Sequence, residues 1–352
     1  MSRRKTILFC LLAAIPFTIN RAASAQAVAN AQIHGIVQDS TGAVVMGAQV
    51  KAKQVSTGYT QTVVSDSSGN YVLLNLPVGP YTIDVSARGF KACTRSGIVL
   101  QVGDNVLINV ALTVGNVSER VVVSGQAAAV QTEDTAISQV IDQQRIVDLP
   151  LNGSQATDLI LLSGGAAHPP NAQGRDVTSH DYVNSTAVSV SGGQINGNNY
   201  LLDGADNNDS HSNINLPFPF PDALQEFSVE TNGISARYGL HPGSVVNVVP
   251  RSGTNSFHGS LFEFVRNGDF NANNFPATKQ DNLHRNQYGG TIGGPIRRNK
   301  IFAFGGFQET KNRTAPPGSV AFVATQQVLD GDFSALESPA CQSSGVQQQL
   351  VD

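Results

Sequence analysis

Hydrophobic and polar positions alternate over short runs in the first third of the chain, and turn residues separate these runs. Between about residues 32 and 114 the runs recur every ~8–12 residues, a spacing typical of a small β-sandwich. The strands that this pattern predicts are Ile33–Gln38, Ala48–Val55, Tyr59–Val64, Tyr71–Leu74, Tyr81–Ala87, Ile98–Val102 and Val106–Leu112. Their predicted core includes Ile36, Val50, Val63, Tyr71, Leu73, Ile83 and Val110.

The pattern becomes mixed between Val130 and about Pro250. Short helices are predicted at Asp142–Leu149 and Thr157–Leu162, and strands at Ile137–Ile141, Val188–Ser191, Asn199–Asp203, Gln225–Glu230 and Val245–Val249. The last of these strands is valine at every position except Asn247. A run without alternation is typical of a strand buried on both faces.

The third part of the chain alternates again, with a different character. Two sets of residues alternate between positions 287 and 296. One set is Tyr288, Gly290, Ile292, Gly294 and Ile296, and the other is Gln287, Gly289, Thr291, Gly293 and Pro295. Apolar residues on one face and small or polar residues on the other are typical of a strand in an outer-membrane barrel. Two further runs, Phe257–Arg266 and Ile301–Glu309, are rich in aromatic residues but alternate less regularly. A soluble sandwich is the alternative that the pattern leaves open.

The N-terminus has the three parts of a secretory signal peptide. A basic start at Met1–Lys5 precedes an apolar run from Thr6 to Ile19, and Ala23-Ser24-Ala25 follows. The apolar run is shorter than the ~20 residues that a spanning helix needs, and Pro16 interrupts it. The mature chain is therefore expected to begin at Gln26.

Composition narrows the class of protein. Charged residues are 14% of the chain, against about 25% in ordinary soluble domains. A net charge of −4 gives no basic face for nucleic acid. Once Cys10 leaves with the signal peptide, Cys93 and Cys341 are too few for a disulfide framework. These features favour an exported, mainly β protein.

The sequence contains no motif of a known catalytic site. None of the seven histidines has a glutamate three positions later, as a zinc carboxypeptidase requires, and the H-E-x-x-H, G-x-S-x-G and P-loop patterns do not occur. We expect neither enzymatic activity nor a cofactor. Three aspartates in one short loop suggest a calcium-binding site; they are Asp203, Asp206 and Asp209. Their spacing does not fit an EF-hand loop, and an Asp-Gly pair is equally typical of a tight turn.

Several stretches resemble known families. HGIVQDSTGAVVMGAQVKAK, TVVSDSSGNYVLLNLPVGPYTIDVSARGF and LINVALTVG resemble the carboxypeptidase regulatory-like domain. The segments VIDQQRIVDLPLNGSQATDLILLSGG, VSGGQINGNNYLLDGADNND and ARYGLHPGSVVNVVPRSGTNSFHGSLFEFVRN resemble the plug of TonB-dependent outer-membrane receptors of the Oar-like type, and RNQYGGTIGGPIRRNKIFAFGGFQE and GDFSAL continue the match.

The resemblance implies a mainly β architecture with five parts. These are a signal peptide at residues 1–25, a transthyretin-like sandwich at 26–115, a linker at 116–129, a mixed α/β plug at 130–250 and the first strands of a barrel at 251–352. The plug motif comprises Asn199, Tyr200, Asp203, Gly204 and Asp206. Because a plugged barrel has about 22 strands, we expect this chain to be the N-terminal part of a receptor, unable to transport as it stands.

The resemblance also gives a second interpretation to a short valine-rich segment. By itself this segment is an eighth strand or a linker, and the resemblance suggests instead a TonB box. Its residues are Glu119, Arg120, Val121, Val122 and Val123. A TonB box is an extended segment that an inner-membrane energy-coupling protein of the TonB type captures by strand addition.

Two functions remain at this stage. The first is energy-coupled uptake of a scarce solute, such as a carbohydrate or a peptide, across the outer membrane of a Gram-negative-type bacterium, with TonB-type protein and outer-membrane lipid as partners. The second is a cell-surface or periplasmic interaction protein whose sandwich binds carbohydrate.

The signal motif generates the first prediction. We expect cleavage after Ala25, because small residues at positions 23 and 25 suit signal peptidase. Mass spectrometry of exported protein should find Gln26 at the N-terminus, and an intact Met1 would contradict the interpretation.

Overall fold

The computed structural model describes residues 30–116, 120–124, 136–151, 153–168, 187–235, 238–239, 241–272, 282–313 and 324–338. The predicted signal peptide and Glu119 lie outside these ranges. The chain divides into two compact units, Met1–Phe264 with Gln287–Thr310, and Val265–Asn286 with Lys311–Asp352. The second unit holds two short helices, α3 (Gln326–Leu329) and α4 (Ser334–Glu337).

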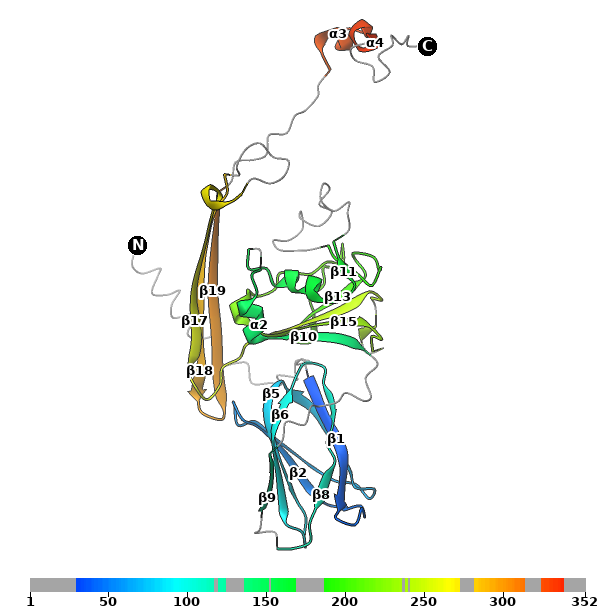
Figure 1. Cartoon of the computed structure of the whole chain (residues 1–352), viewed down its shortest axis with the longest axis vertical. Helices are drawn as coiled ribbons and strands as arrows, with labels where there is room; N and C mark the ends of the chain where they lie inside the picture. The colour runs from blue at the N-terminus through cyan, green and yellow to red at the C-terminus, as the bar shows by residue number, and fades with distance from the viewer. Residues whose placement is uncertain are drawn as a thin grey trace, which may run out of the picture. The chain divides into compact units, whose positions relative to one another are not determined.

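Nine strands form the N-terminal sheet pair (Figure 1). They are β1 (Asn30–Asp39), β2 (Gln49–Gln54), β3 (Thr60–Val64), β4 (Asn70–Pro77), β5 (Gly79–Ser86), β6 (Ala92–Leu100), β7 (Asn105–Leu107), β8 (Val110–Leu112) and β9 (Arg120–Ser124). One sheet has the order β4-β1-β7, with β8 also paired to β1, and the other has the order β3-β2-β5-β6-β9. Each strand predicted between Ile33 and Leu112 has a counterpart, but the predicted strand Val106–Leu112 is two short strands, β7 and β8, and β6 begins at Ala92 rather than Ile98.

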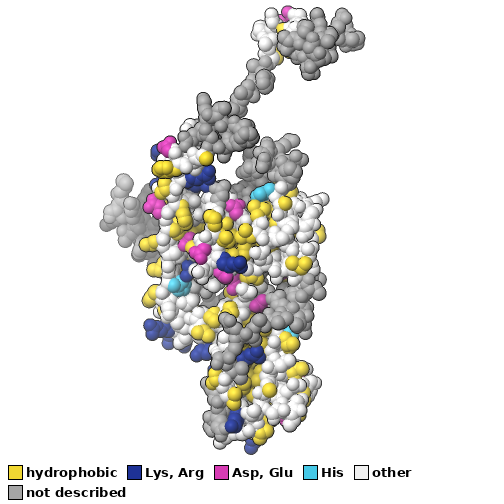
Figure 2. Space-filling model, viewed as in Figure 1, with side chains coloured by type: hydrophobic (Ala, Val, Ile, Leu, Met, Phe, Trp, Pro, Cys, Tyr) yellow, Lys and Arg dark blue, Asp and Glu magenta, His cyan; other side chains and the backbone are white. Residues whose placement is uncertain are grey.

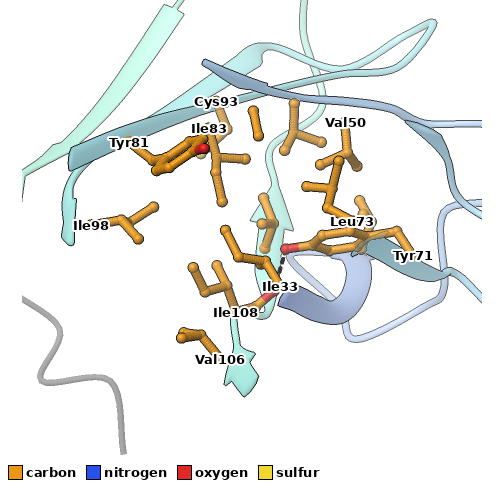
Figure 3. Packing of buried hydrophobic residues seen from close by; sticks show 14 of the residues in the cluster. Ile33, Val50, Tyr71, Leu73, Tyr81, Ile83, Cys93, Ile98, Val106 and Ile108 are labelled. Carbon is orange, nitrogen blue, oxygen red and sulfur yellow. Dashed lines mark hydrogen bonds between the residues drawn. The ribbon is translucent and has the colours of Figure 1, made fainter. Parts of the chain in front are cut away.

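One hydrophobic core is shared by the two sheets of this pair. Tyr71 and Leu73 of β4 pack in the same cluster as Val50 of β2 and Ile83 of β5 (Figure 3). The Tyr71 hydroxyl donates a hydrogen bond of 2.7 Å to the carbonyl of Ile108, which satisfies a polar group that would otherwise be buried unpaired. Val110 is also buried, and Val63 packs against the cluster from its edge.

The predicted core position Ile36 is wrong. In β1 the buried side chains are those of Ala31, Ile33 and Val37, and Ile36 is only partly buried. Successive side chains of a strand point to opposite faces, so Ile36 lies on the face opposite to Ile33 and Val37. The other side chains on the face of Ile36, among them Gln32, His34 and Gln38, are polar, so the alternation of β1 itself marks this face as the less buried one.

A second sheet, the central sheet, follows in the chain. It comprises β10 (Ile137–Asp142), β13 (Asn198–Leu202), β14 (Ala205–Asp206), β15 (Leu224–Asn232) and β16 (Ser244–Pro250) in the order β10-β15-β16-β13-β14. Only β13 and β16 pair in parallel. β16 is buried from Ser244 to Val249, so the prediction of a strand covered on both faces is confirmed.

Helical segments cover one face of the central sheet. The helix α2 (Gln143–Asp148) and the segments η2 (Ala156–Leu162) and η3 (Pro221–Ala223) accompany the sheet, together with the small ladder of β11 (Ala166–Ala167) and β12 (Ser189–Val190). Ile146 of α2 and Leu159 of η2 pack against Phe227 of β15 in one buried cluster. The predicted helix at 157–162 is a 3₁₀ helix.

Three long strands form the third sheet, the long-strand sheet (Figure 1). These are β17 (His258–Asn267), β18 (His284–Arg297) and β19 (Ile301–Arg313), with the 3₁₀ turn η5 (Gly268–Phe270) after β17. In β18, Ile292 is 70% exposed whereas its neighbour Thr291 is 7% exposed. The predicted alternation of apolar and small or polar residues is therefore confirmed, and Figure 2 shows hydrophobic side chains along these strands.

No helix among the residues that the structure describes is long and apolar enough to cross a membrane.

Adjacent leucines of β4 generate a test of the N-terminal core. We expect residues 26–115 to fold alone with a β-type far-UV circular dichroism spectrum, because a core of this size supports marginal stability. In that fragment Leu73→Ala should lower the free energy of unfolding by about 2–5 kcal/mol, since Leu73 is fully buried. Leu74 is 50% exposed, so Leu74→Ala should cost less than about 1 kcal/mol. Urea titration measures both; equal losses would refute this assignment of the core.

Candidate functional site

The predicted coupling segment forms strand β9 at the end of a sheet. Arg120–Ser124 pairs in parallel with Ala92–Ser96 of β6, with Val121 opposite Cys93 and Val122 opposite Thr94. Val122 is 61% exposed. The segment is thus an edge strand of the N-terminal sheet pair, which agrees with the interpretation as an eighth strand and leaves the TonB box untested.

Two residues of the predicted plug motif form a tight hairpin turn. Asp203 and Gly204 connect β13 to β14 and both have positive φ, at 53° and 78°. Two positive φ values in a two-residue loop are typical of a type I′ turn, in which Asp-Gly is strongly favoured. Asp206 follows in β14, and its carboxylate accepts a hydrogen bond of 3.0 Å from the Asn208 amide. These aspartates therefore shape the loop.

An asparagine network then fixes the loop against β13. The Asn208 side chain accepts a hydrogen bond of 2.6 Å from the Tyr200 amide and donates one of 3.0 Å to the Asn198 carbonyl. It also donates to the Asn213 side chain at 2.8 Å. Each of these amides supplies both a donor and an acceptor. The sequence signal for this network, three asparagines within 16 residues of one another, was not used in the prediction.

The other two residues of the plug motif are structural. Tyr200 is fully buried in the core of the central sheet, with its ring 6.2 Å from that of Phe218. Burial raises the pKa of Tyr200 to about 12, so the phenol is neutral at physiological pH. Asn199 lies on the opposite face, and its side chain donates a hydrogen bond of 3.1 Å to the carbonyl of Tyr238.

No group of three or more His, Cys, Asp or Glu side chains with metal-binding geometry occurs among the described residues. Asp209, the third aspartate of the loop, accepts hydrogen bonds from the amide and the hydroxyl of Ser212 at 2.7 and 2.6 Å. Its carboxylate is thus engaged in the same turn.

The opposite face of the central sheet is buried but polar, which the sequence analysis missed. Glu226, Ser228 and Glu230 alternate along β15, and Ser228 pairs with Asn247 of β16. The Asn247 side-chain oxygen is buried, and no described residue donates a hydrogen bond to it. The available signal was the period-two pattern Glu-Phe-Ser-Val-Glu in β15.

The carboxyl group of Glu226 on this polar face has a raised pKa. Its carboxylate accepts a hydrogen bond of 2.9 Å from the backbone amide of Val102. Burial raises the pKa of Glu226 to about 7, the carboxylates of Asp104 and Asp142 add to the effect, and the Val102 amide opposes it. Asp142 is also the cross-strand partner of Glu226.

Comparison with known proteins follows the same division of the chain. Residues 32–113 match the family described as carboxypeptidase regulatory-like domain, and residues 249–350 match the family described as outer membrane beta barrel domain. The TonB-dependent transporter Oar of Myxococcus xanthus is 28% identical over 263 residues. This chain is similar to a TonB-dependent outer-membrane transporter. The match covers 72% of the chain and 24% of Oar, so the chain spans about a quarter of the length of this relative.

Similarity to solved structures is distant. The siderophore receptor PirA from Acinetobacter baumannii has a TM-score of 0.35 at 18% identity, covering 49% of this chain and 24% of PirA. Catechol 1,2-dioxygenase from Acinetobacter radioresistens has a TM-score of 0.21 at 18% identity, covering 28% of this chain and 58% of the dioxygenase.

The buried Glu226 predicts a pH dependence of stability. Because its pKa in the folded protein, about 7, lies above the ordinary value of 4.5, the folded state binds the extra proton. The contribution of the Glu226 carboxyl group to the free energy of unfolding is fully present below pH 4.5 and is lost as the pH rises through 7. The loss is on the order of 3 kcal/mol.

We expect Glu226→Gln to flatten the pH profile in this window and to be more stable than the parent above pH 7. Asp148→Asn, at an exposed position, is the matched control. Urea unfolding of the mature chain in detergent across this pH range measures the effect. An unchanged slope in Glu226→Gln would exclude this carboxyl group as the cause.

Proposed function

We propose that this chain is the N-terminal portion of a TonB-dependent outer-membrane receptor for energy-coupled uptake of a scarce solute. In this proposal residues 26–115 are a regulatory-like sandwich, 116–129 a linker with the coupling strand, 130–250 the plug, and 251 onward the beginning of the barrel. The observation that carries it is the outward apolar face of β17–β19, which follows directly after the buried central sheet.

The long-strand sheet supports the role of a barrel wall. Its apolar face carries Leu261, Ile292 and Phe307, all exposed, as expected of side chains that meet lipid. The opposite face carries Ser260 and Thr291, whose hydroxyl groups are 2.9 Å apart. We propose that this second face is the inner surface of the wall.

Contacts between the inner face and the central part of the chain support the plug assignment. Gln287 of β18 donates a hydrogen bond of 2.7 Å to the carbonyl of Gly153, which follows α2. Phe220 lies against Phe262 of β17, with ring centroids 5.7 Å apart. A Cβ atom on Gly306 of β19 would lie 2.8 Å from the Phe220 ring, so glycine at this position makes room for it.

In the proposed mechanism the plug blocks the barrel until it is displaced, and no catalytic step is required. In this proposal the central sheet, braced by the Asp203-Gly204 turn and the asparagine network, moves as one body, and its main hydrophobic cluster is separate from that of the N-terminal sheet pair. A rigid plug that contacts the wall by few polar and aromatic groups can be displaced as a unit when the coupling protein draws on its N-terminal segment. We propose a binding and transport role in the outer membrane, reached after removal of the signal peptide.

The coupling step can be tested in a complete receptor that carries this N-terminus. Val122→Pro removes a backbone donor from β9 and interrupts a ladder, so uptake should fall by roughly tenfold or more. Glu119→Gln should change uptake little, since backbone hydrogen bonds rather than side chains supply most of the affinity in strand addition. Solute uptake, surface level and binding to the periplasmic coupling domain are measured for both. Equal uptake by Val122→Pro and the parent would assign the segment to a linker.

A further inference from the structure

One end of the N-terminal sheet pair carries three neighbouring connections. The strand register places Gln54 opposite Tyr81 and Gly79 opposite Leu100. The β2–β3 connection follows Gln54, the β4–β5 connection precedes Gly79, and the β6–β7 connection follows Leu100. All three therefore lie at the same end of the strands, which we call the loop end. The loop end and the central sheet belong to the same compact unit of the chain.

The β6–β7 connection contacts the central sheet through Val102. The Val102 side chain is 6% exposed and packs in a small buried cluster with Val249 of β16, and Val78 of the β4–β5 connection packs against both. The backbone amide of Val102 donates its 2.9 Å hydrogen bond to the side chain of Glu226 in β15. Val102 thus brings an apolar side chain and a polar backbone group to one contact with the central sheet.

The β2–β3 connection makes a second contact, with the segment that joins the central sheet to the long-strand sheet. The carbonyl of Ser56 accepts a hydrogen bond of 2.9 Å from the backbone amide of Asn255. The Asn255 side chain accepts one hydrogen bond from the Asn299 amide and donates another to the Asn299 side chain, both of 2.8 Å. A Cβ atom on Gly58 would clash with the Asn299 side chain, so glycine permits this approach. The contact contains no ionisable group.

Glu226 meets other acidic groups where the loop end contacts the central sheet. Burial raises the pKa of Glu226 most, and the carboxylates of Asp104 in the β6–β7 connection and Asp142 in β10 raise it further, while the Val102 amide lowers it. Glu230 lies on the same face of β15, and β16 contains no titratable residue. An ionised Glu226 would therefore add a third negative charge to those of Asp104 and Asp142 in a contact that excludes water.

We propose that the loop end docks on the central sheet while Glu226 is protonated and leaves it when Glu226 ionises. Release returns the charged carboxylate to water, and its hydration offsets the loss of the Val102–Val249 contact. Because the pKa of Glu226 in the docked protein is about 7 and its ordinary value is 4.5, docking is fully favoured below pH 4.5 and is lost as the pH rises through 7.

The uncharged contact of Ser56 with Asn255 does not change with pH, so it keeps the loop end close to the central sheet after release. Docking involves groups of this chain alone and is independent of the transport role proposed above.

The labelling rate of a thiol at position 102 measures docking in the mature chain in detergent. Val102→Cys in a Cys93→Ala, Cys341→Ser background places a single thiol in the contact. Leu107→Cys in the same background is the matched control, because Leu107 is 43% exposed. The ratio of the two labelling rates removes the intrinsic pH dependence of thiolate formation. We expect Val102→Cys to be labelled roughly tenfold or more slowly than the control at about pH 5.5 and at a similar rate at about pH 8.5.

Glu226→Gln identifies the titrating group. Glutamine accepts the hydrogen bond of the Val102 amide and does not ionise, so this substitution should preserve slow labelling at about pH 8.5. A ratio of rates that does not change with pH would overturn the inference. An equal change with and without Glu226→Gln would overturn it too, because another group would then control the contact.

Hydrogen exchange of the Val102 amide reads the same contact with valine retained at position 102. After correction for the intrinsic exchange rate, the protection of this amide should fall roughly tenfold or more between about pH 5.5 and about pH 8.5 in the parent chain and persist in Glu226→Gln. Amides of β2, which pairs on both edges, should stay protected throughout. An unprotected Val102 amide at about pH 5.5, or full protection in the parent at about pH 8.5, would contradict release by Glu226.

Discussion

The pairing of backbone hydrogen-bonding groups at strand edges is the constraint on which this structure depends. A strand buries a donor and an acceptor at each residue, and each group left without a partner away from water costs free energy. Charged side chains on an edge strand prevent further pairing. Only 14% of the residues in this chain are charged, so few edges can be protected in this way. The inner strands of the N-terminal sheet pair and of the central sheet meet the constraint on both edges inside their own sheets. β9 and the outer strands of the long-strand sheet retain edges at which further pairing can occur, and the proposed functions of coupling and of barrel formation both use such edges.

Alternation along the sequence predicted what depends on local pattern. The N-terminal strands, the doubly buried β16 and the two-faced β18 follow from the period of two and from turn residues, because each property is encoded within a few consecutive positions. The resemblance to receptor segments supplied the order of the parts, which no periodicity encodes. Comparison with Oar and with the two domain families confirmed that resemblance.

Features that depend on distant partners could not be predicted in this way. Ile36 is a different case: the other side chains on its face, Gln32, His34 and Gln38, are polar, so the period of two in β1 already places it opposite Ile33 and Val37. The period of two in β15 marks a polar face, but the burial of that face was not predictable because Glu226 meets the amide of Val102, which is 124 residues earlier in the chain. The Asp203-Gly204 turn was recognisable, but the role of Asn208 in joining the loop to β13 required the structure.

Asn247 illustrates a consequence of placing one polar side chain in an apolar strand. Val246 and Val248 of β16 face the hydrophobic cluster, and Asn247 faces the polar side with Ser228. Because side chains alternate, a shift of β16 by one residue would place the Asn247 amide among Tyr200 and Phe227 and would turn both valines toward Glu226 and Glu230. Four valines alone would tolerate either alignment. The single asparagine therefore makes one alignment of β16 between β13 and β15 preferable to the other, at the expense of a buried amide oxygen without a donor among the described residues.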